Sequence, residues 1–111
     1  MMIKFIPYDD GGIYVMKALE NEKELGFCTF TVSGFDMKFE TVSCSDDIII
    51  EGLARAAMNF AANRNAYIAK IKSEHMCAAF KRLGFSGDNE PSVEIPEALT
   101  SGCSCSHEKP Y

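Results

Sequence analysis

The hydrophobic period of this chain changes near residue 45, and this change constrains the fold more than any other feature. Between Phe35 and Val42 apolar and polar residues alternate, as they do in an antiparallel strand with one buried face. From Asp46 to about Arg64 the apolar residues recur instead at the spacing of an amphipathic helix. Such a helix buries its apolar stripe against another element, so we expect it to pack on the sheet.

Turn signals divide the chain before the helix into four segments that favour strands. Asp9-Asp10-Gly11-Gly12 is the clearest of these signals, because glycine adopts positive φ without steric cost. The four predicted strands are Met2–Tyr8, Ile13–Glu20, Leu25–Val32 and Phe35–Val42. After the helix we predict a buried strand Ala66–Ile71, a helix Glu74–Leu83 capped by Ser73, and a short strand Ser92–Ile95. The predicted class is α/β (α+β): a mixed, mostly antiparallel sheet with two packed helices.

Length and composition limit the domain organisation and the partners. The 111 residues suffice for one domain, which we expect over 1–96, followed by a Cys/His-containing C-terminal tail over 97–111. The formal charge of −5 and the lack of a basic stripe argue against nucleic acid as a partner. No apolar run approaches the roughly 20 residues that cross a bilayer. The N-terminus does not have the pattern of a signal peptide, so we expect a cytoplasmic protein without a membrane partner.

The order of elements and one motif carry a family resemblance. A strand meander is followed by a helix, a buried strand and a second helix that ends in Ala79-Phe80-Lys81-Arg82-Leu83-Gly84-Phe85. This order resembles the GNAT superfamily of acyl-CoA-dependent N-acetyltransferases, whose last helix ends in a similar Leu-Gly-Phe. The resemblance covers roughly Ile13 to Phe85. It implies transfer of an acyl group from acetyl-CoA to an amine on a small molecule or a protein.

The same resemblance implies where acetyl-CoA would bind. In the family, the pyrophosphate lies on free backbone N–H groups at the start of the first helix, where the helix dipole favours an anion. Gly52 and Ala54 agree with the family's Arg/Gln-x-x-Gly-x-Gly/Ala loop, but Ile49 replaces the Arg or Gln. The residues expected to bind the cofactor are Ser45, Asp46, Asp47, Ile48, Gly52 and Ala54. The two aspartates oppose this prediction, because their charges repel a pyrophosphate.

The resemblance also implies a general base and an acceptor pocket. Glu40 matches the family's glutamate on the strand before the helix, although it also fits a solvent-facing strand carboxylate. Phe80 stands where many members have a tyrosine that protonates the departing thiolate. Family members usually insert two helices between the first and second strands, and only Asp9 to Gly12 lies there. We therefore expect a homodimer, with an uncovered apolar face formed by Phe27, Phe30, Phe35 and Phe39.

Cysteine and histidine residues suggest a second kind of chemistry. Cys103, Cys105 and His107 fall in a stretch of five residues inside a serine-rich segment. Thiolate and imidazole are ligands for zinc or iron. Cys44, His75 and Cys77 lie near the expected helix starts and could complete such a site. The alternative for Cys77 is a core position and for His75 a helix surface.

Three functional hypotheses therefore stay open. The first is an N-acyltransferase that uses acyl-CoA. The second is a protein that shares the fold, has lost this chemistry and acts as a thiol or metal module. The third is a dimeric, non-catalytic protein-interaction module. Fold alone does not choose among them.

Overall fold

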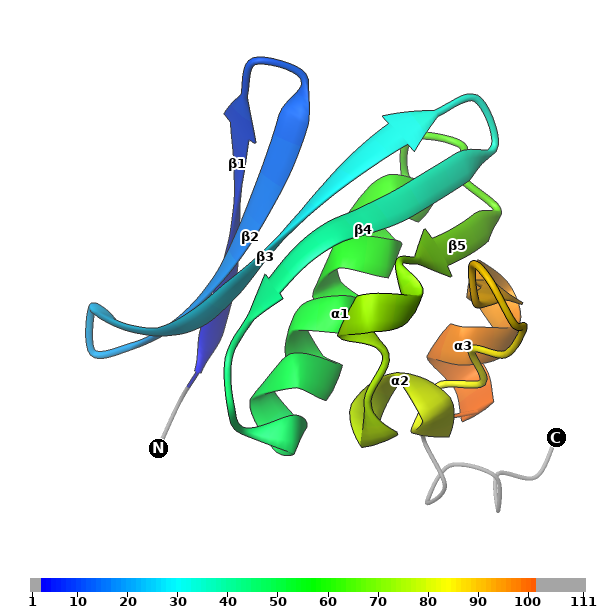
Figure 1. The fold of residues 1–111 in the computed structure, drawn as a ribbon. Coiled ribbons are helices and arrows are strands. Elements are labelled where there is room, and N and C mark those ends of the chain that lie inside the picture. The colour runs from blue at the N-terminus through cyan, green and yellow to red at the C-terminus, as the bar shows by residue number, and fades with distance from the viewer. Residues whose placement is uncertain (1–2, 102–111) are drawn as a thin grey trace, which may run out of the picture.

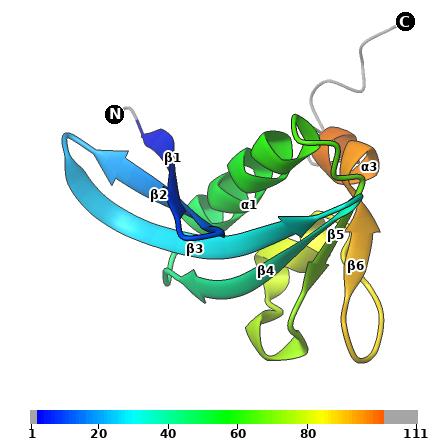
Figure 2. The same cartoon turned by 90° about the horizontal axis from the view of Figure 1, so that it is seen from above.

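Residues 3–101 are described by the computed structural model, and a six-stranded sheet forms their framework (Figures 1 and 2). The strands are β1 (Lys4–Asp10), β2 (Ile13–Glu20), β3 (Lys23–Ser33), β4 (Asp36–Ser43), β5 (Ile68–Ile71) and β6 (Ser92–Glu94). They lie side by side in chain order. Every neighbouring pair is antiparallel except β4 and β5, which are parallel. The predicted mixed, mostly antiparallel sheet is thus confirmed.

Helix α1 (Asp47–Ala62) connects the parallel strands and packs against β1 to β4. Helices α2 (Ala78–Arg82) and α3 (Ile95–Ser101) both contact α1, and a short 3-10 turn η1 (Ser73–His75) precedes α2. Apolar side chains from the sheet and from these helices form one continuous core. Its largest fully buried members include Phe30, Phe39, Leu53, Met58 and Phe80. None of the helices within residues 3–101 is long and apolar enough to span a membrane.

Strand β4 is irregular at Glu40. Phe39 is paired with Phe30 and Thr41 with Thr29, so Glu40 has no opposite residue on β3. This is a β-bulge, which bends the strand and changes the direction of its side chains. On the other side, β4 pairs with β5 only as far as the Phe39–Ile71 pair, although β4 itself continues to Ser43. The two parallel strands therefore separate beside the bulge.

The predicted second helix, Glu74–Leu83, is wrong in its first half. The backbone of Met76 and Cys77 is extended, which separates η1 from the single turn and a half of α2. No side chain caps either piece, so the predicted cap by Ser73 is not formed. The second half of the predicted helix does pack on the core, where Ala79, Phe80 and Leu83 are buried. Packing of Phe80 against Phe39 holds α2 on the core. This tertiary contact outweighs the local preference for helix around Met76.

The expected uncovered apolar face is also wrong. Phe30 and Phe39 are fully buried beneath the helices, because they lie on the side of the sheet that packs against α1 and α2. Phe27 is half-buried, and Phe35 alone of the four is mainly exposed, at 72%. The four phenylalanines therefore do not form one surface and give no support to a homodimer, which stays a prediction from the missing helix pair.

Candidate functional site

The end of β4, the start of α1 and the segment after β5 lie at the same end of the sheet. Parallel strands leave a sheet at a common edge, and β4 and β5 diverge after Phe39 and Ile71. Only residues 44–46 separate β4 from α1. The predicted base Glu40, Cys44 and the predicted cofactor-binding residues 45–48 lie at this end, so it is the candidate site.

Glu40 forms an ion pair across the point where the strands diverge. Its Oε1 lies 3.2 Å from Nζ of Lys72, the first residue after β5. The Glu40 side chain is 30% exposed. The ion pair continues a row of paired charges along β4, in which Lys70 contacts Asp36 at 3.3 Å. This arrangement agrees with the solvent-facing alternative, and the role of Glu40 as a base stays a prediction.

Another ion pair in this row is short enough to shift the pKa values of both partners. Lys38 Nζ lies 2.6 Å from Glu90 Oε2. The hydrogen bond to Glu90 raises the pKa of Lys38, and the same contact lowers the pKa of the Glu90 carboxyl. Both side chains are therefore held in their charged forms, and the charge pattern beside Glu40 is fixed around neutral pH.

The start of α1 is capped by its own chain. The Asp46 carboxylate accepts a hydrogen bond from the Ile48 amide at 2.9 Å, and the Asp46 carbonyl accepts one from Ile50 N–H at 2.9 Å. Asp47 adds a second carboxylate in the first turn. Both carboxylates stabilise the helix dipole. Asp46 occupies the Ile48 amide that an incoming anion would need, and both negative charges repel that anion. Among the predicted cofactor-binding residues, Ser45 is exposed beside this cap.

Gly52 and Ala54 lie further inside α1 than the resemblance implies. Because α1 begins at Asp47, their amides belong to the second turn and beyond, where N–H groups donate to the carbonyl four residues earlier. A Cβ on Gly52 would lie 2.5 Å from Cζ of Phe5, so glycine is required here for packing of β1 on α1. Ala54 is 1% exposed. Both residues have core roles that explain their small side chains.

A shallow hollow of about 450 Å³ adjoins the start of α1. It is lined by Glu24, Leu25, Gly26, Phe27, Ser43, Cys44 and Ser45. The Cys44 thiol contacts the Leu25 carbonyl at 3.7 Å and the Asp46 carbonyl at 3.8 Å. A Cβ on Gly26 would lie 2.7 Å from Cβ of Cys44, so this glycine makes room for the thiol. The hollow was not predicted from the sequence, because it depends on the register between β3 and β4, which no local pattern reveals.

Phe80 offers no ionisable proton near the site. It is 1% exposed and its ring packs 5.3 Å from Phe39 and 5.2 Å from Phe85, measured between ring centroids. Tyr67 precedes β5 and therefore lies at the strand end opposite to the divergence. Its hydroxyl donates to Glu94 at 3.3 Å, and the nearby Glu94 charge raises the pKa of Tyr67. Tyr14 packs edge-on against Phe60 at 4.9 Å.

The predicted metal ligands are only partly covered by the structure. Cys103, Cys105 and His107 lie outside the described residues. Within residues 3–101, no three His, Cys, Asp or Glu side chains are grouped to hold a metal ion. His75 lies in η1, 3.6 Å from Glu74, and Cys77 is the N-cap residue of α2. The metal hypothesis stays a prediction that depends on the C-terminal segment.

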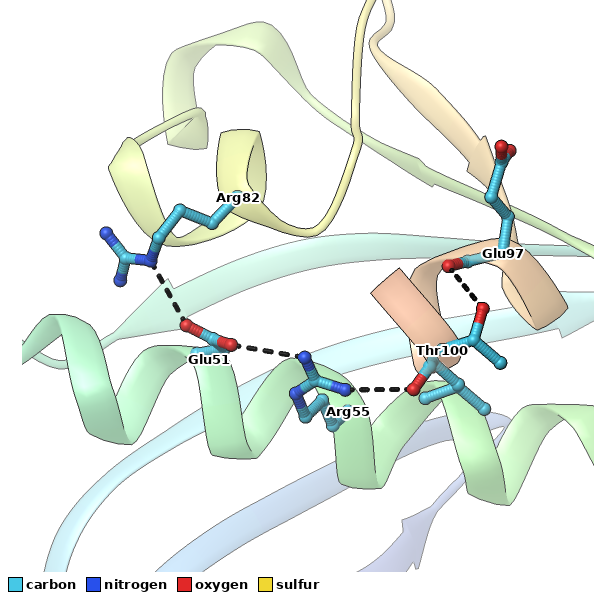
Figure 3. A network of polar contacts seen from close by, with 6 residues as sticks. Glu51, Arg55, Arg82, Glu97 and Thr100 are labelled. Atoms are coloured by element: carbon cyan, nitrogen blue, oxygen red, sulfur yellow. Dashed lines mark hydrogen bonds and ion pairs between the residues drawn. The ribbon is translucent and has the colours of Figure 1, made fainter. Parts of the chain in front are cut away.

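A polar network centred on Glu51, in the second turn of α1, joins α1, α2 and α3 (Figure 3). Glu51 accepts from Arg82 Nε on α2 and from Arg55 on α1, each at 3.2 Å. Arg55 also donates to the Leu99 carbonyl on α3 at 3.2 Å. This network was not predicted from the sequence, although the four-residue spacing of Glu51 and Arg55 is a signal for their ion pair.

Comparison with solved structures identifies the fold. A GNAT family acetyltransferase from Elizabethkingia anophelis with acetyl-CoA bound matches at a TM-score of 0.67 and 11% identity, over 83% of this chain and 97% of that chain. The PaiA N-acetyltransferase from Thermoplasma acidophilum, in complex with coenzyme A, matches at 0.65 and 9%, over 75% and 61%. An aminoglycoside 6′-N-acetyltransferase from Enterococcus faecium matches at 0.63 and 11%, over 78% and 76%. No protein-family model and no curated protein matches the sequence.

The chain has the GNAT fold, as the resemblance predicted. The identities are too low to carry more than the fold. The match to nearly the whole Elizabethkingia chain is informative about size, because a GNAT structure of similar extent exists with acetyl-CoA bound. At least one chain of similar extent therefore combines this fold with bound acetyl-CoA.

Proposed function

We propose that the protein binds an acyl-CoA where β4 and β5 diverge and transfers the acyl group to an amine. The observation that carries the proposal is the parallel pair β4–β5, whose pairing stops at Phe39 and Ile71 directly beside Glu40. Its setting in a GNAT fold supports the proposal, since structural neighbours are acetyltransferases crystallised with coenzyme A or acetyl-CoA.

The residues assigned to acyl-CoA are those at the start of α1. Ser45 is exposed, and the amide of Asp47 precedes the first hydrogen bond inside the helix. The Ile48 amide is held by Asp46, so a bound pyrophosphate would have to replace that carboxylate. Gly52 and Ala54 have no free amides for the ligand. They contribute indirectly, because their small side chains let α1 pack on the core. This assignment implies modest affinity, because two carboxylates lie next to the ligand.

The proposed reaction is direct transfer. The amine nitrogen attacks the thioester carbonyl carbon, a C–N bond forms, and the C–S bond breaks so that coenzyme A leaves as a thiolate. The proton lost by the amine passes to Glu40, directly or through water. The acceptor is a small-molecule or protein amine. Because Phe80 cannot donate a proton, the thiolate takes its proton from solvent.

Product analysis with matched variants tests this proposal. The protein is incubated with acetyl-CoA and primary amines, including a polyamine, an aminoglycoside and a lysine peptide, and acetylated product is measured by mass spectrometry. We expect Glu40→Gln to lower the rate about 100-fold, the smaller end of general-base effects. Glu74→Gln removes a nearby exposed carboxylate and should leave the rate within about twofold.

Two results would separate the parts of this proposal. Full activity of Glu40→Gln would show that another group is the base. No acetylated amine above the protein-free background, in spite of acetyl-CoA binding, would overturn transfer for these acceptors.

A second candidate is a non-catalytic GNAT-fold protein that binds a metal or another protein. The self-capped start of α1 favours it, because Asp46 already satisfies the Ile48 amide. Metal analysis of protein purified without chelator tests the metal form, with Cys103→Ser/Cys105→Ser as the comparison. Stoichiometric zinc or iron that disappears in the double variant would support it. Absence of metal together with a stable dimer in solution would favour protein interaction.

A further inference from the structure

The guanidinium of Arg82 is held on one side and free on the other. Its Nε donates to Oε1 of Glu51 at 3.2 Å, while its two terminal nitrogens have no partner within residues 3–101. Figure 3 shows these two nitrogens directed away from Glu51. The side chain is 49% exposed, so the free edge can meet a ligand from solvent.

Arg55 provides the contrast within the same network. Its Nη2 donates to Oε2 of Glu51 and its Nη1 to the Leu99 carbonyl, so both terminal groups are used inside the molecule. One carboxylate thus lies between two guanidiniums, and the cluster has a net positive charge in a chain of formal charge −5. Lys81, the neighbour of Arg82 in the last turn of α2, is exposed and adds to this charge. An anion is the ligand that such a cluster attracts.

The cluster lies beside the first turns of α1. Glu51 follows Asp47 by four residues, which is about 6 Å along a helix axis. A phosphate-bearing ligand at the start of α1 would be repelled by Asp46 and Asp47 and would lack a cation in the loop, where the resemblance has an Arg or Gln and this chain has Ile49. Glu51 holds the Arg82 guanidinium at the second turn of α1, where its positive charge could offset this repulsion.

We propose that Arg82, oriented by Glu51, binds a phosphate group of the 3′-phospho-ADP part of acyl-CoA. This inference rests on the proposed function. A guanidinium whose Nε is fixed presents its terminal N–H groups in a defined plane, which suits two parallel hydrogen bonds to phosphate oxygens. Glu51 is a positioning residue in this arrangement, since it fixes the plane without contacting the ligand.

Calorimetric titrations of the full chain test the proposal with two probes. Acetyl-CoA carries the whole ligand, and adenosine 3′,5′-bisphosphate carries phosphates without the thioester. We expect Arg82→Gln to raise the Kd for both probes about tenfold, as for loss of a charged hydrogen bond. Arg82→Lys keeps the charge without the fork and should be intermediate. Arg64→Gln is the matched control, because its exposed guanidinium lies 3.7 Å over the Phe60 ring, at the other end of α1.

The outcomes separate this inference from the proposed function. Equal affinities of wild type and Arg82→Gln for both probes would overturn the role of Arg82 and leave acyl-CoA binding intact. Arg82-dependent binding of the bisphosphate without binding of acetyl-CoA would keep Arg82 as a phosphate-binding residue and overturn the proposed function. Failure of the wild type to bind either probe would overturn both. A similar loss in Arg64→Gln would show a general charge effect and also overturn the specific role.

Discussion

Asp46 and Asp47 decide how the start of α1 can be used. Asp46 fills the cap position and holds the Ile48 amide, whereas Asp47 makes no hydrogen bond or ion pair of its side chain within residues 3–101. The two carboxylates therefore differ in what their removal would change. Loss of the Asp46 side chain frees an amide and weakens the helix, while loss of the Asp47 charge changes mainly the local field.

Asp47→Asn should strengthen acetyl-CoA binding. A first-turn charge contributes roughly 0.3–1 kcal/mol to a helix dipole, and we expect a similar repulsion of a nearby pyrophosphate, which is about a two- to fivefold change in Kd. Calorimetry measures it, with Asp88→Asn in the loop before β6 as the control for net charge. Weaker binding in Asp47→Asn would show that this carboxylate assists the ligand.

Single residues are explained well where one local rule decides their role. Asp46 accepts a hydrogen bond from a first-turn amide, as aspartate commonly does at an N-cap, and Cys28 is a small buried residue that is 1% exposed. Burial raises the pKa of the Cys28 thiol to about 12, so it stays protonated. Gly52 shows the limit of such rules. This residue matches the glycine of the family's cofactor-binding loop, but α1 begins five residues earlier. A side chain at this position would clash with the Phe5 ring, which explains the glycine.

At the scale of elements, the contact between α1 and β1 depends on Gly52. Gly52→Ala should lower the free energy of unfolding by up to about 2 kcal/mol, because the cost of overpacking against the Phe5 ring, roughly 1–3 kcal/mol, exceeds the gain of about 1 kcal/mol in helix propensity. Urea unfolding measures the change. In a Phe5→Leu background the same substitution should cost less, since the clashing ring is gone. An equal cost in both backgrounds would contradict the packing explanation.

The attachment of α3 depends on Arg55. This side chain joins α1 to the Leu99 carbonyl, and it is about one-quarter exposed. Arg55→Met should keep most of the apolar contact and speed amide exchange in α3 several-fold more than in β2, as measured by hydrogen–deuterium exchange. Lys23→Met, in the β2–β3 hairpin, is the control. Uniform acceleration across the molecule would point to general destabilisation instead.

Hydrophobic periodicity predicted the helix and strands that bury one face against the core. It failed where a proline or tertiary packing determines whether a helix forms. Strands β2 to β4 and α1 were found within two residues of their bounds. Helix α3 was missed because Pro96 suggested the start of a tail, yet proline is tolerated in the first turn of a helix. Buried Ile95 and Ala98 then attach α3 to the core. The β-bulge at Glu40 depends on cross-strand register, which one strand's sequence does not encode.

At the scale of the molecule, the GNAT fold brings together residues distant in sequence. Glu40 and Lys72 meet where β4 and β5 separate, and Glu51 and Arg82 join α1 to α2. The order of elements and the Leu-Gly-Phe ending of the last helix carried the resemblance that predicted this fold. This resemblance was not sufficient to predict the ion pairs, which depend on side chains 30 or more residues apart.

The central claim is that acyl-CoA binds at the start of α1, and an acetyl-CoA titration of the reduced protein tests it most directly. Heats are measured at two temperatures, and backbone amide shifts of Ser45, Asp47 and Ile48 are followed by NMR in the same titration. The account predicts micromolar affinity, with the largest shifts at these amides. No heat at either temperature and no shift at high micromolar acetyl-CoA would contradict it.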